Sequence, residues 1–281
     1  MLRYELKPQQ IQAYADFLQA EEKSTATMEK YLRDIRVFTC WLDGREISKE
    51  LTAEWKAHLT AQNYAPASVN AMLSALNSLL EFLDLRDCRV KFLKVQRRMF
   101  RDADRELTKS EYQRLLTAAR ELGRERIGLL AETIGATGIR VSEVRYITVE
   151  AAQQGKAEIA LKGKIRVILL PGKLCRKLLK FAKKQKNASG AIFRTRSGKE
   201  LDRRQIWAEL KGLCRQASVA PRKVFPHNLR HLFAIVFYQV SRDIVKLADL
   251  LGHSSIETTR IYLITSGAEH QRELEQLGLV S

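Results

Sequence analysis

Cysteine is scarce in this 281-residue chain, and the four that occur are far apart in the sequence. Cys40, Cys88, Cys175 and Cys214 show neither the paired spacing of a zinc site nor the spacing of a redox pair. We therefore expect reduced thiols that pack inside the protein, and we expect no structural zinc site.

Long apolar runs are also lacking. No uncharged stretch is long enough to cross a bilayer, and residues 1–7 contain no continuous apolar region of the kind that a signal peptide needs. We therefore expect a cytoplasmic protein with no membrane partner. The chain is still 45% hydrophobic, so it can bury sizeable cores, and its length fits two domains.

Acidic residues are outnumbered by basic ones, with 32 Asp and Glu against 49 Lys and Arg, for a formal net charge of +17. Such a charge attracts polyanions and makes their binding sensitive to salt, which favours nucleic acid as the partner. The alternative is that the charge only keeps a helical protein in solution. Basic residues cluster within 97–105 and within 173–186, where Leu174, Leu178 and Phe181 at helical spacing place the lysines on the outer face of a packed helix.

Four short motifs contain the groups needed to cut a phosphodiester without a metal ion. They are TGIR at 137–140, LKG at 161–163, HNLRH at 227–231, and LGH at 251–253 followed by Tyr262. Guanidinium groups stay protonated and match pairs of phosphate oxygens, so Arg140 and Arg230 can clamp the two non-bridging oxygens and stabilise their developing charge.

The remaining groups of the motifs can move protons. Tyr262 has a hydroxyl of ordinary pKa about 10, which becomes a nucleophile once its proton is removed or the neighbouring cations favour phenolate. His227 and His253 can accept that proton or donate a hydrogen bond to a phosphate oxygen. Lys162, in a turn beside the phosphate, can give a proton to the departing sugar oxygen.

These motifs, in this order, resemble those of the tyrosine recombinase (phage integrase) family. ATGIRVSEV at 136–144 is similar to the family's first-arginine motif, with Arg140 as the catalytic arginine and Glu143 as its supporting acid. HNLRH is similar to the His-x-x-Arg-His box, which assigns His227 and Arg230 to the site.

The last two motifs complete the resemblance. LLGHSSIETTRIY at 250–262 is similar to the closing motif, in which His253 is the last polar ligand and Tyr262, nine positions later, is the nucleophile. Lys162 looks like the family's hairpin lysine, and Lys164 is a competing assignment. The resemblance implies the catalytic set Arg140, Lys162, His227, Arg230, His253 and Tyr262, and no cofactor.

The resemblance also implies a reaction and its partners. Tyr262 would attack a scissile phosphate to form a 3′-phosphotyrosyl bond, and a 5′-hydroxyl of a partner duplex would then attack that bond, without ATP. Family members act on double-stranded DNA as a tetramer on two core sites, through a Holliday junction. Accessory proteins or a partner recombinase are left open, as is the choice between mobile-element integration or excision and dimer resolution.

Other readings stay open at this point. Tyr262 by itself is typical of a half-buried packing residue, and only its neighbouring motifs favour the nucleophile. A type IB topoisomerase uses similar chemistry but reseals the same strand, and a DNA-binding regulator would need no tyrosine.

The pattern predicts a mainly α protein with a small β-hairpin. We expect helices over 9–22, 25–41, 53–62 and 67–84, which form an amino-terminal helical bundle at 1–94 similar to the family's SAM-like core-binding domain. A basic linker at 95–106 leads to a mixed α+β catalytic domain at 107–281. We expect its hairpin at 157–161 and 165–170, with a further strand at 191–193.

The two ends of the chain carry further expectations. The tail at 267–280 is amphipathic, and it either docks on a neighbouring subunit or packs on its own domain. No extra domain is expected ahead of the core-binding region, which resembles the simpler, Xer-like design of the family.

Overall fold

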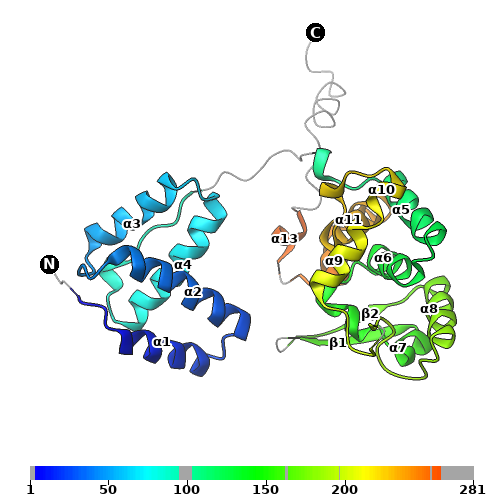
Figure 1. Cartoon of the computed structure of the whole chain (residues 1–281), viewed down its shortest axis with the longest axis horizontal. Coiled ribbons are helices and arrows are strands. Elements are labelled where there is room, and N and C mark those ends of the chain that lie inside the picture. The colour runs from blue at the N-terminus through cyan, green and yellow to red at the C-terminus, as the bar shows by residue number, and fades with distance from the viewer. Residues whose placement is uncertain (1–3, 95–102, 162–163, 196, 254, 261–281) are drawn as a thin grey trace, which may run out of the picture. The chain divides into compact units, whose positions relative to one another are not determined.

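The computed structural model describes residues 4–94, 103–161, 164–195, 197–253 and 255–260. The chain divides into two compact units, residues 1–97 and 98–281. Both are built mainly from helices, and the described residues form a two-stranded antiparallel sheet in the second unit (Figure 1). The predicted fold class is thereby confirmed. No helix in the described part of the chain has the length and apolar character needed to span a bilayer.

Within its described residues, 4–94, the first unit contains four helices and one short 3-10 turn. They are α1 Pro8–Ala20, α2 Thr25–Leu42, α3 Lys49–Ala61, α4 Pro66–Phe82 and η1 Arg86–Cys88. The predicted start of α2 after Ser24 is confirmed. The predicted start of the third helix at Ala53 is wrong, because the Ser48 hydroxyl accepts a hydrogen bond from the Leu51 N–H (3.2 Å) and starts α3 four residues earlier.

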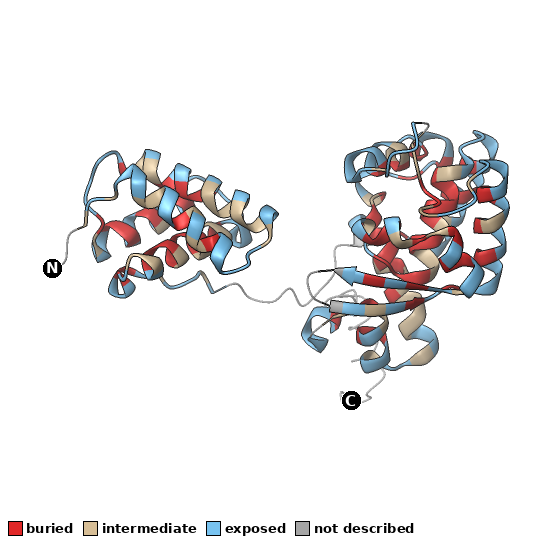
Figure 2. Cartoon of the chain, turned by 90° about the horizontal axis from the view of Figure 1, so that it is seen from below, coloured by how far each residue is buried: buried red, intermediate tan, exposed pale blue. Residues whose placement is uncertain are grey.

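Aromatic side chains fill the core of the first unit. Phe38, Trp41 and Trp55 lie with their ring centroids 5.0–6.2 Å apart, and Phe38 and Trp55 are each 1% exposed. Figure 2 shows the buried residues on the inner faces of the helices. Burial of these apolar faces is what makes the four helices one unit, since isolated helices of this length are marginal in water.

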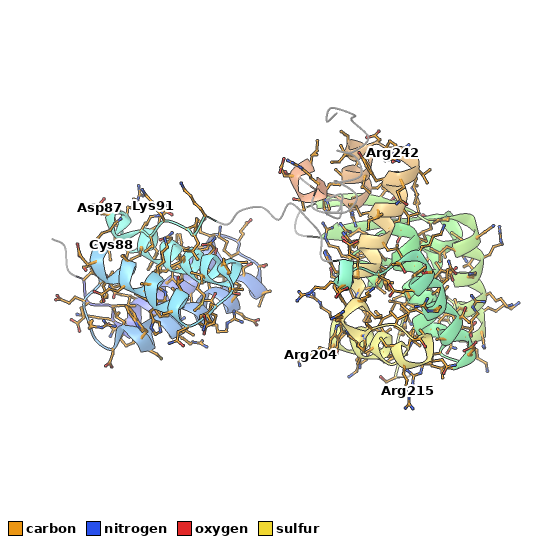
Figure 3. The ribbon with its side chains drawn as sticks, turned by 90° about the horizontal axis from the view of Figure 1, so that it is seen from above. Asp87, Cys88, Lys91, Arg204, Arg215 and Arg242 are labelled. Atoms are coloured by element: carbon orange, nitrogen blue, oxygen red, sulfur yellow. The ribbon has the colours of Figure 1, made fainter. Side chains whose placement is uncertain are left out.

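The segment after α4 is fastened to the unit by polar side chains. The Asn77 amide, 6% exposed, donates to the Val90 carbonyl and accepts from the Val90 N–H, each at 2.9 Å. Lys49 on α3 donates to the carbonyls of Asp87 and Arg89. Figure 3 labels Asp87, Cys88 and Lys91 along this segment. The backbone that leads out of the unit is therefore paired up to residue 93, where Asn70 repeats the arrangement with Leu93.

The second unit contains helices, 3-10 turns and a hairpin. They are η2 Ala103–Arg105, α5 Lys109–Glu121, α6 Glu125–Thr137, η3 Val141–Tyr146, α7 Val149–Gln154, β1 Lys156–Leu161, β2 Lys164–Leu169, α8 Gly172–Lys184, α9 Arg203–Lys211, α10 Cys214–Ala217, η4 Pro221–Lys223, α11 Pro226–Ser241, α12 Ile244–Leu251 and α13 Ile256–Arg260. Helix α5 begins with a capping box, in which Thr108 and Glu111 exchange hydrogen bonds at 2.8 and 3.1 Å.

Helix α6 is the centre of the second unit. It contacts α5, α8, α9 and α11, and eight of its thirteen residues are buried (Figure 1). Helix α8 also packs on it, with Leu174, Leu178 and Phe181 buried and its lysines on the exposed face, as predicted. Two of those lysines, Lys177 and Lys184, form ion pairs with glutamates of α6.

The hairpin has a simple register. Lys156 pairs with Leu169 at one end and Leu161 with Lys164 at the other, within one residue of the predicted strands. The predicted strand at 191–193 is wrong, because these residues make only an isolated bridge between Thr148 and Ala191. An outer surface on β2 is apolar, with Ile165, Val167 and Leu169 exposed, so the inward side of that strand carries Arg166 and Ile168.

Replacing Asn77 by alanine should destabilise the first unit by about 1–3 kcal/mol, because it leaves the Val90 N–H and carbonyl without their partner. Urea unfolding followed by tryptophan fluorescence measures this in a Trp207→Phe background, where both remaining tryptophans, Trp41 and Trp55, belong to the first unit. Gln19→Ala, at an exposed position on α1, is the control and should change the free energy by less than about 0.5 kcal/mol. Equal effects of the two substitutions would contradict the role of Asn77.

Candidate active site

Two glycines end helices and direct backbone carbonyls toward one place. Gly138 ends α6 with φ of 65°, and a Cβ there would lie 2.4 Å from the Phe233 ring. Gly252 ends α12 with φ of 62°, and a Cβ there would lie 2.4 Å from the Arg166 guanidinium. Positive φ and close packing both require glycine at these positions. The TGIR and LGH motifs are therefore helix ends as well as carriers of polar side chains.

Arg230 lies at the meeting point of these helix ends. It belongs to α11 and is 2% exposed. Its Nη1 donates to the Gly138 carbonyl (2.5 Å), and its Nη2 donates to the Leu251 carbonyl (2.7 Å) and contacts Nε2 of His253 (2.9 Å). A buried cation is costly unless its donors are paired, and three partners from two separate segments hold this one.

The contact with Arg230 determines the form of His253. A guanidinium can only donate, so Nε2 of His253 is the acceptor, and Nδ1 carries the proton that it donates to the Thr259 hydroxyl (2.8 Å). Thr259 on α13 is fully buried. Burial, Arg230, Arg140 and Arg166 together lower the pKa of His253 to about 4, so the ring is neutral at pH 7.

Arg140 faces the solvent beside this buried centre. Its side chain is 42% exposed, while that of Glu143 is 4% exposed. The Glu143 carboxylate accepts from the Arg140 N–H (2.7 Å) and from Nη1 of Arg140 (3.1 Å), and Nη2 of Arg140 donates to the Gly252 carbonyl (3.3 Å). The predicted pairing of Arg140 with Glu143 is thus present in the structure, and it fixes the direction in which this exposed guanidinium points.

Arg166 was not predicted from the sequence. It lies on β2, its side chain is 16% exposed, and its Nη2 forms an ion pair with the Glu143 carboxylate. Its Nη1 donates to the Leu250 carbonyl (3.2 Å). Strand alternation contained a signal, since Arg166 has the same parity as the buried Ile168 and must point inward.

His227 and Arg230 both line a cavity of about 1050 Å³. His227 is exposed to this cavity, yet desolvation by the atoms packed against it, followed by Arg230, Arg203 and Arg140, lowers its pKa. Five arginines and one glutamate line the cavity, namely Arg140, Arg145, Arg203, Arg204, Arg230 and Glu200. Arg204 points outward from the unit in Figure 3. The cavity is therefore suited to an anion.

The structure brings four of the predicted residues, Arg140, His227, Arg230 and His253, into one site. Lys162 and Tyr262 lie outside the described residues, as do the basic cluster before 103 and the tail at 267–280. The described residues contain no group of three or more His, Cys, Asp or Glu side chains that could hold a metal ion.

Each of the two units matches the sequence profile of a known protein family. The sequence profile of the phage integrase family matches residues 105–268, and that of the phage integrase N-terminal SAM-like domain matches residues 11–87. The tyrosine recombinase XerA of Thermococcus kodakarensis is 29% identical over 275 residues, which cover 95% of this chain and 94% of that protein.

Two solved structures share the fold. One is the XerH site-specific recombinase bound to difH substrate in a pre-cleavage complex, with a TM-score of 0.69 and 19% identity over 95% of this chain and 84% of the other. The other is a lambda integrase tetramer bound to a Holliday junction, with a TM-score of 0.72 and 16% identity over 90% of this chain and 76% of the other.

The neutral His253 should make stability depend on pH. Between its ordinary pKa of about 6.5 and its folded value of about 4, the unfolded state binds a proton that the folded state does not. The depressed pKa of His253 therefore contributes to the stability of the folded state in full above pH 6.5, and this contribution is lost as the pH falls toward 4. In thermal unfolding, His253→Gln should show a shallower loss of stability than the wild type over this window, and parallel curves would contradict the assignment.

Proposed function

Because this chain belongs to the phage integrase family of tyrosine recombinases, we propose that Tyr262 attacks a DNA phosphate bound by Arg140 and Arg230. The protein is an enzyme of site-specific DNA recombination. The observation that carries the residue assignments is the convergence of Arg140, His227, Arg230 and His253, from distant segments, on one arginine-rich site. No metal or cofactor enters the proposed reaction.

Two arginines would stabilise the charge of the transition state in different ways. Arg230 is held by the Gly138 and Leu251 carbonyls, so its donors are oriented before DNA arrives and need no reorganisation during the reaction. Arg140 is more exposed and is directed by Glu143, which suits it to reach a phosphate that enters from the cavity. Together they can bind the two non-bridging oxygens and supply the positive charge.

The protons would follow a defined route. In cleavage, the Tyr262 oxygen bonds to phosphorus and its proton passes to His227, while the bond to the 5′-oxygen breaks and that oxygen takes a proton from Lys162. His253 would hold Arg230 in place and would not take part in proton transfer, because both of its ring nitrogens already have partners. In rejoining, a 5′-hydroxyl attacks the 3′-phosphotyrosyl bond, and the same groups return the protons. The phosphodiester energy stays in the protein–DNA bond.

The proposed partners are double-stranded core sites and three further copies of this chain. The lambda integrase relative was solved as a tetramer on a Holliday junction, and XerH was solved on difH substrate. We propose the same assembly here, acting in mobile-element integration or excision or in dimer resolution. The tail at 267–280 would dock on a neighbouring subunit, with packing on its own unit as the alternative.

Tyr262→Phe should abolish the covalent protein–DNA adduct. The measurement is a suicide substrate with a nick next to the scissile phosphate, so that the freed 5′ end diffuses away and the adduct survives denaturation. The wild type should form the adduct on a core site. Plasmid without a core site should not be relaxed, because relaxation would indicate a type IB topoisomerase. Failure of the wild type to form any adduct would favour a DNA-binding regulator.

Arg140→Ala should slow cleavage much more than it weakens DNA binding. Loss of one group that stabilises developing charge costs roughly 10²–10³-fold in rate, or about 3 kcal/mol. Arg204→Ala is the matched control, since this exposed arginine lines the same cavity without contacting Glu143 or a backbone carbonyl in the described structure. It should weaken binding and leave the rate at saturating DNA nearly unchanged. Equal losses of rate and binding for Arg140→Ala would reassign it to docking.

A further inference from the structure

Three segments of the second unit meet at the side chain of Arg166. The η3 turn contacts it through Glu143, and the end of α12 contacts it through Leu250 and Gly252. The third segment is strand β2, to which Arg166 itself belongs. Each segment adjoins one of the motifs singled out in the sequence. We propose that Arg166 is a positioning residue for strand cleavage, which sets the relative placement of Arg140 and Arg230. This inference rests on the function proposed above.

The first arm of the connection runs through Glu143. Its carboxylate, 4% exposed, accepts at Oε1 from Nη1 of Arg140 and at Oε2 from both the Arg140 backbone N–H and Nη2 of Arg166. Arg140 holds Oε2 through its backbone N–H and Oε1 through one hydrogen bond from a side chain that is 42% exposed, which leaves the carboxylate able to turn about the Oε2 contact. The more deeply buried Arg166 removes that freedom, so the direction of the Arg140 guanidinium depends on Arg166.

The second arm runs through the backbone that ends α12. Nη1 of Arg166 donates to the Leu250 carbonyl at 3.2 Å, and the Gly252 backbone packs so closely on Arg166 that a Cβ would lie 2.4 Å from Nη1. The intervening residue, Leu251, supplies the carbonyl that receives Nη2 of Arg230. His253 follows directly. Placement of the Arg230 acceptors therefore also depends on Arg166.

A planar guanidinium is suited to bind the Glu143 carboxylate and the Leu250 carbonyl at the same time. It presents donors in a fixed fork, so that one end reaches a carboxylate while the other reaches a carbonyl. Lysine would keep the charge near Glu143 as a compact ammonium, without the fixed geometry toward Leu250. An apolar residue of similar volume would keep the packing and lose the hydrogen bonds to both Glu143 and Leu250.

Stability alone is a poor explanation for this side chain. Burial lowers the pKa of Arg166, Glu143 raises it and Arg140 lowers it further, so the environment is not purely favourable to the charge. In the part of the chain that the structure describes, its Nε is buried without a hydrogen-bond partner, which costs free energy. Buried ion pairs are weak evidence for stability, since packed apolar groups often do as well.

The test compares single-turnover cleavage of the suicide substrate at saturating DNA for Arg166→Met, Arg166→Lys, Glu143→Gln and the double variant Arg166→Met/Glu143→Gln. Misplacement of reacting groups by about 1 Å can cost ~10²-fold in rate. Arg166→Met should lower the rate constant by about tenfold to a hundredfold, while the DNA dissociation constant stays within about threefold. Arg166→Lys should recover part of the loss. The double variant should react no more slowly than the slower single variant, because both changes break the same connection.

A matched control separates positioning from folding. Arg126 also pairs with one carboxylate, Glu209 (2.5 Å), and one carbonyl, that of Arg194 (2.7 Å), but it lines a different cavity of the same unit. Arg126→Met should lower the unfolding temperature or the fraction of protein that reacts, and it should leave the rate constant of the reacting fraction unchanged.

The outcomes distinguish the two proposals. If Arg166→Met changes only the reacting fraction, as Arg126→Met does, or if the two effects in the double variant multiply, the positioning role is overturned. With either result, the proposed function would still be supported if the wild type forms the covalent adduct and Tyr262→Phe does not. If the wild type forms no adduct, the proposed function itself fails.

Discussion

The arrangement of the second unit depends on the buried guanidinium of Arg230. Two helices, α6 and α12, end with their carbonyls directed at it, and the carboxyl ends of helices carry partial negative charge. This charge makes up in part for the water that the cation has lost. The same geometry explains the glycines, because a helix that must stop abruptly and present its last carbonyls to one point needs a residue at positive φ. Gly138 and Gly252 meet this requirement, with φ of 65° and 62°.

A cation fixed in this way has consequences for its neighbours. His253 is kept neutral because it must accept from Arg230, and its other nitrogen is oriented by Thr259. Arg140 lies at the surface, where Glu143 rather than burial determines its direction. The site thus combines one immobile cation with one that is steered by a carboxylate. An incoming phosphate would meet donors that are already aimed, which is the condition for electrostatic stabilisation of a transition state.

Residues in short local motifs could be predicted from the sequence, whereas contacts between distant segments could not. Arg140, Glu143, His227, Arg230 and His253 were identified because each sits in a short local motif, and the mainly helical fold with one hairpin was predicted correctly from periodicity and turn residues. The start of α3 was missed because Ser48 was not recognised as a cap. The strand at 191–193 was wrong because apolar residues buried in a loop mimic a strand. Arg166 escaped notice because its partners, Glu143 and Leu250, are distant in sequence and adjacent only after folding. The domain boundaries and the catalytic roles of Arg140, Lys162, His227, Arg230, His253 and Tyr262 remain predictions.

The net positive charge, finally, is divided between two kinds of residue with different surroundings. The lysines of α8 lie on an outer face, and Lys177 and Lys184 are paired with Glu132 and Glu125 of α6, where exposed pairs contribute little energy and leave less charge for DNA. The cavity, in contrast, is lined by arginines, with Glu200 as the acidic residue among its lining side chains. Arginine presents paired donors that match phosphate, whereas lysine is a strongly hydrated point charge. The overall charge of +17 therefore accounts for attraction to DNA at long range. Recognition of one phosphate within that field depends on where the arginines are held, and hence on the carbonyls and carboxylates that hold them.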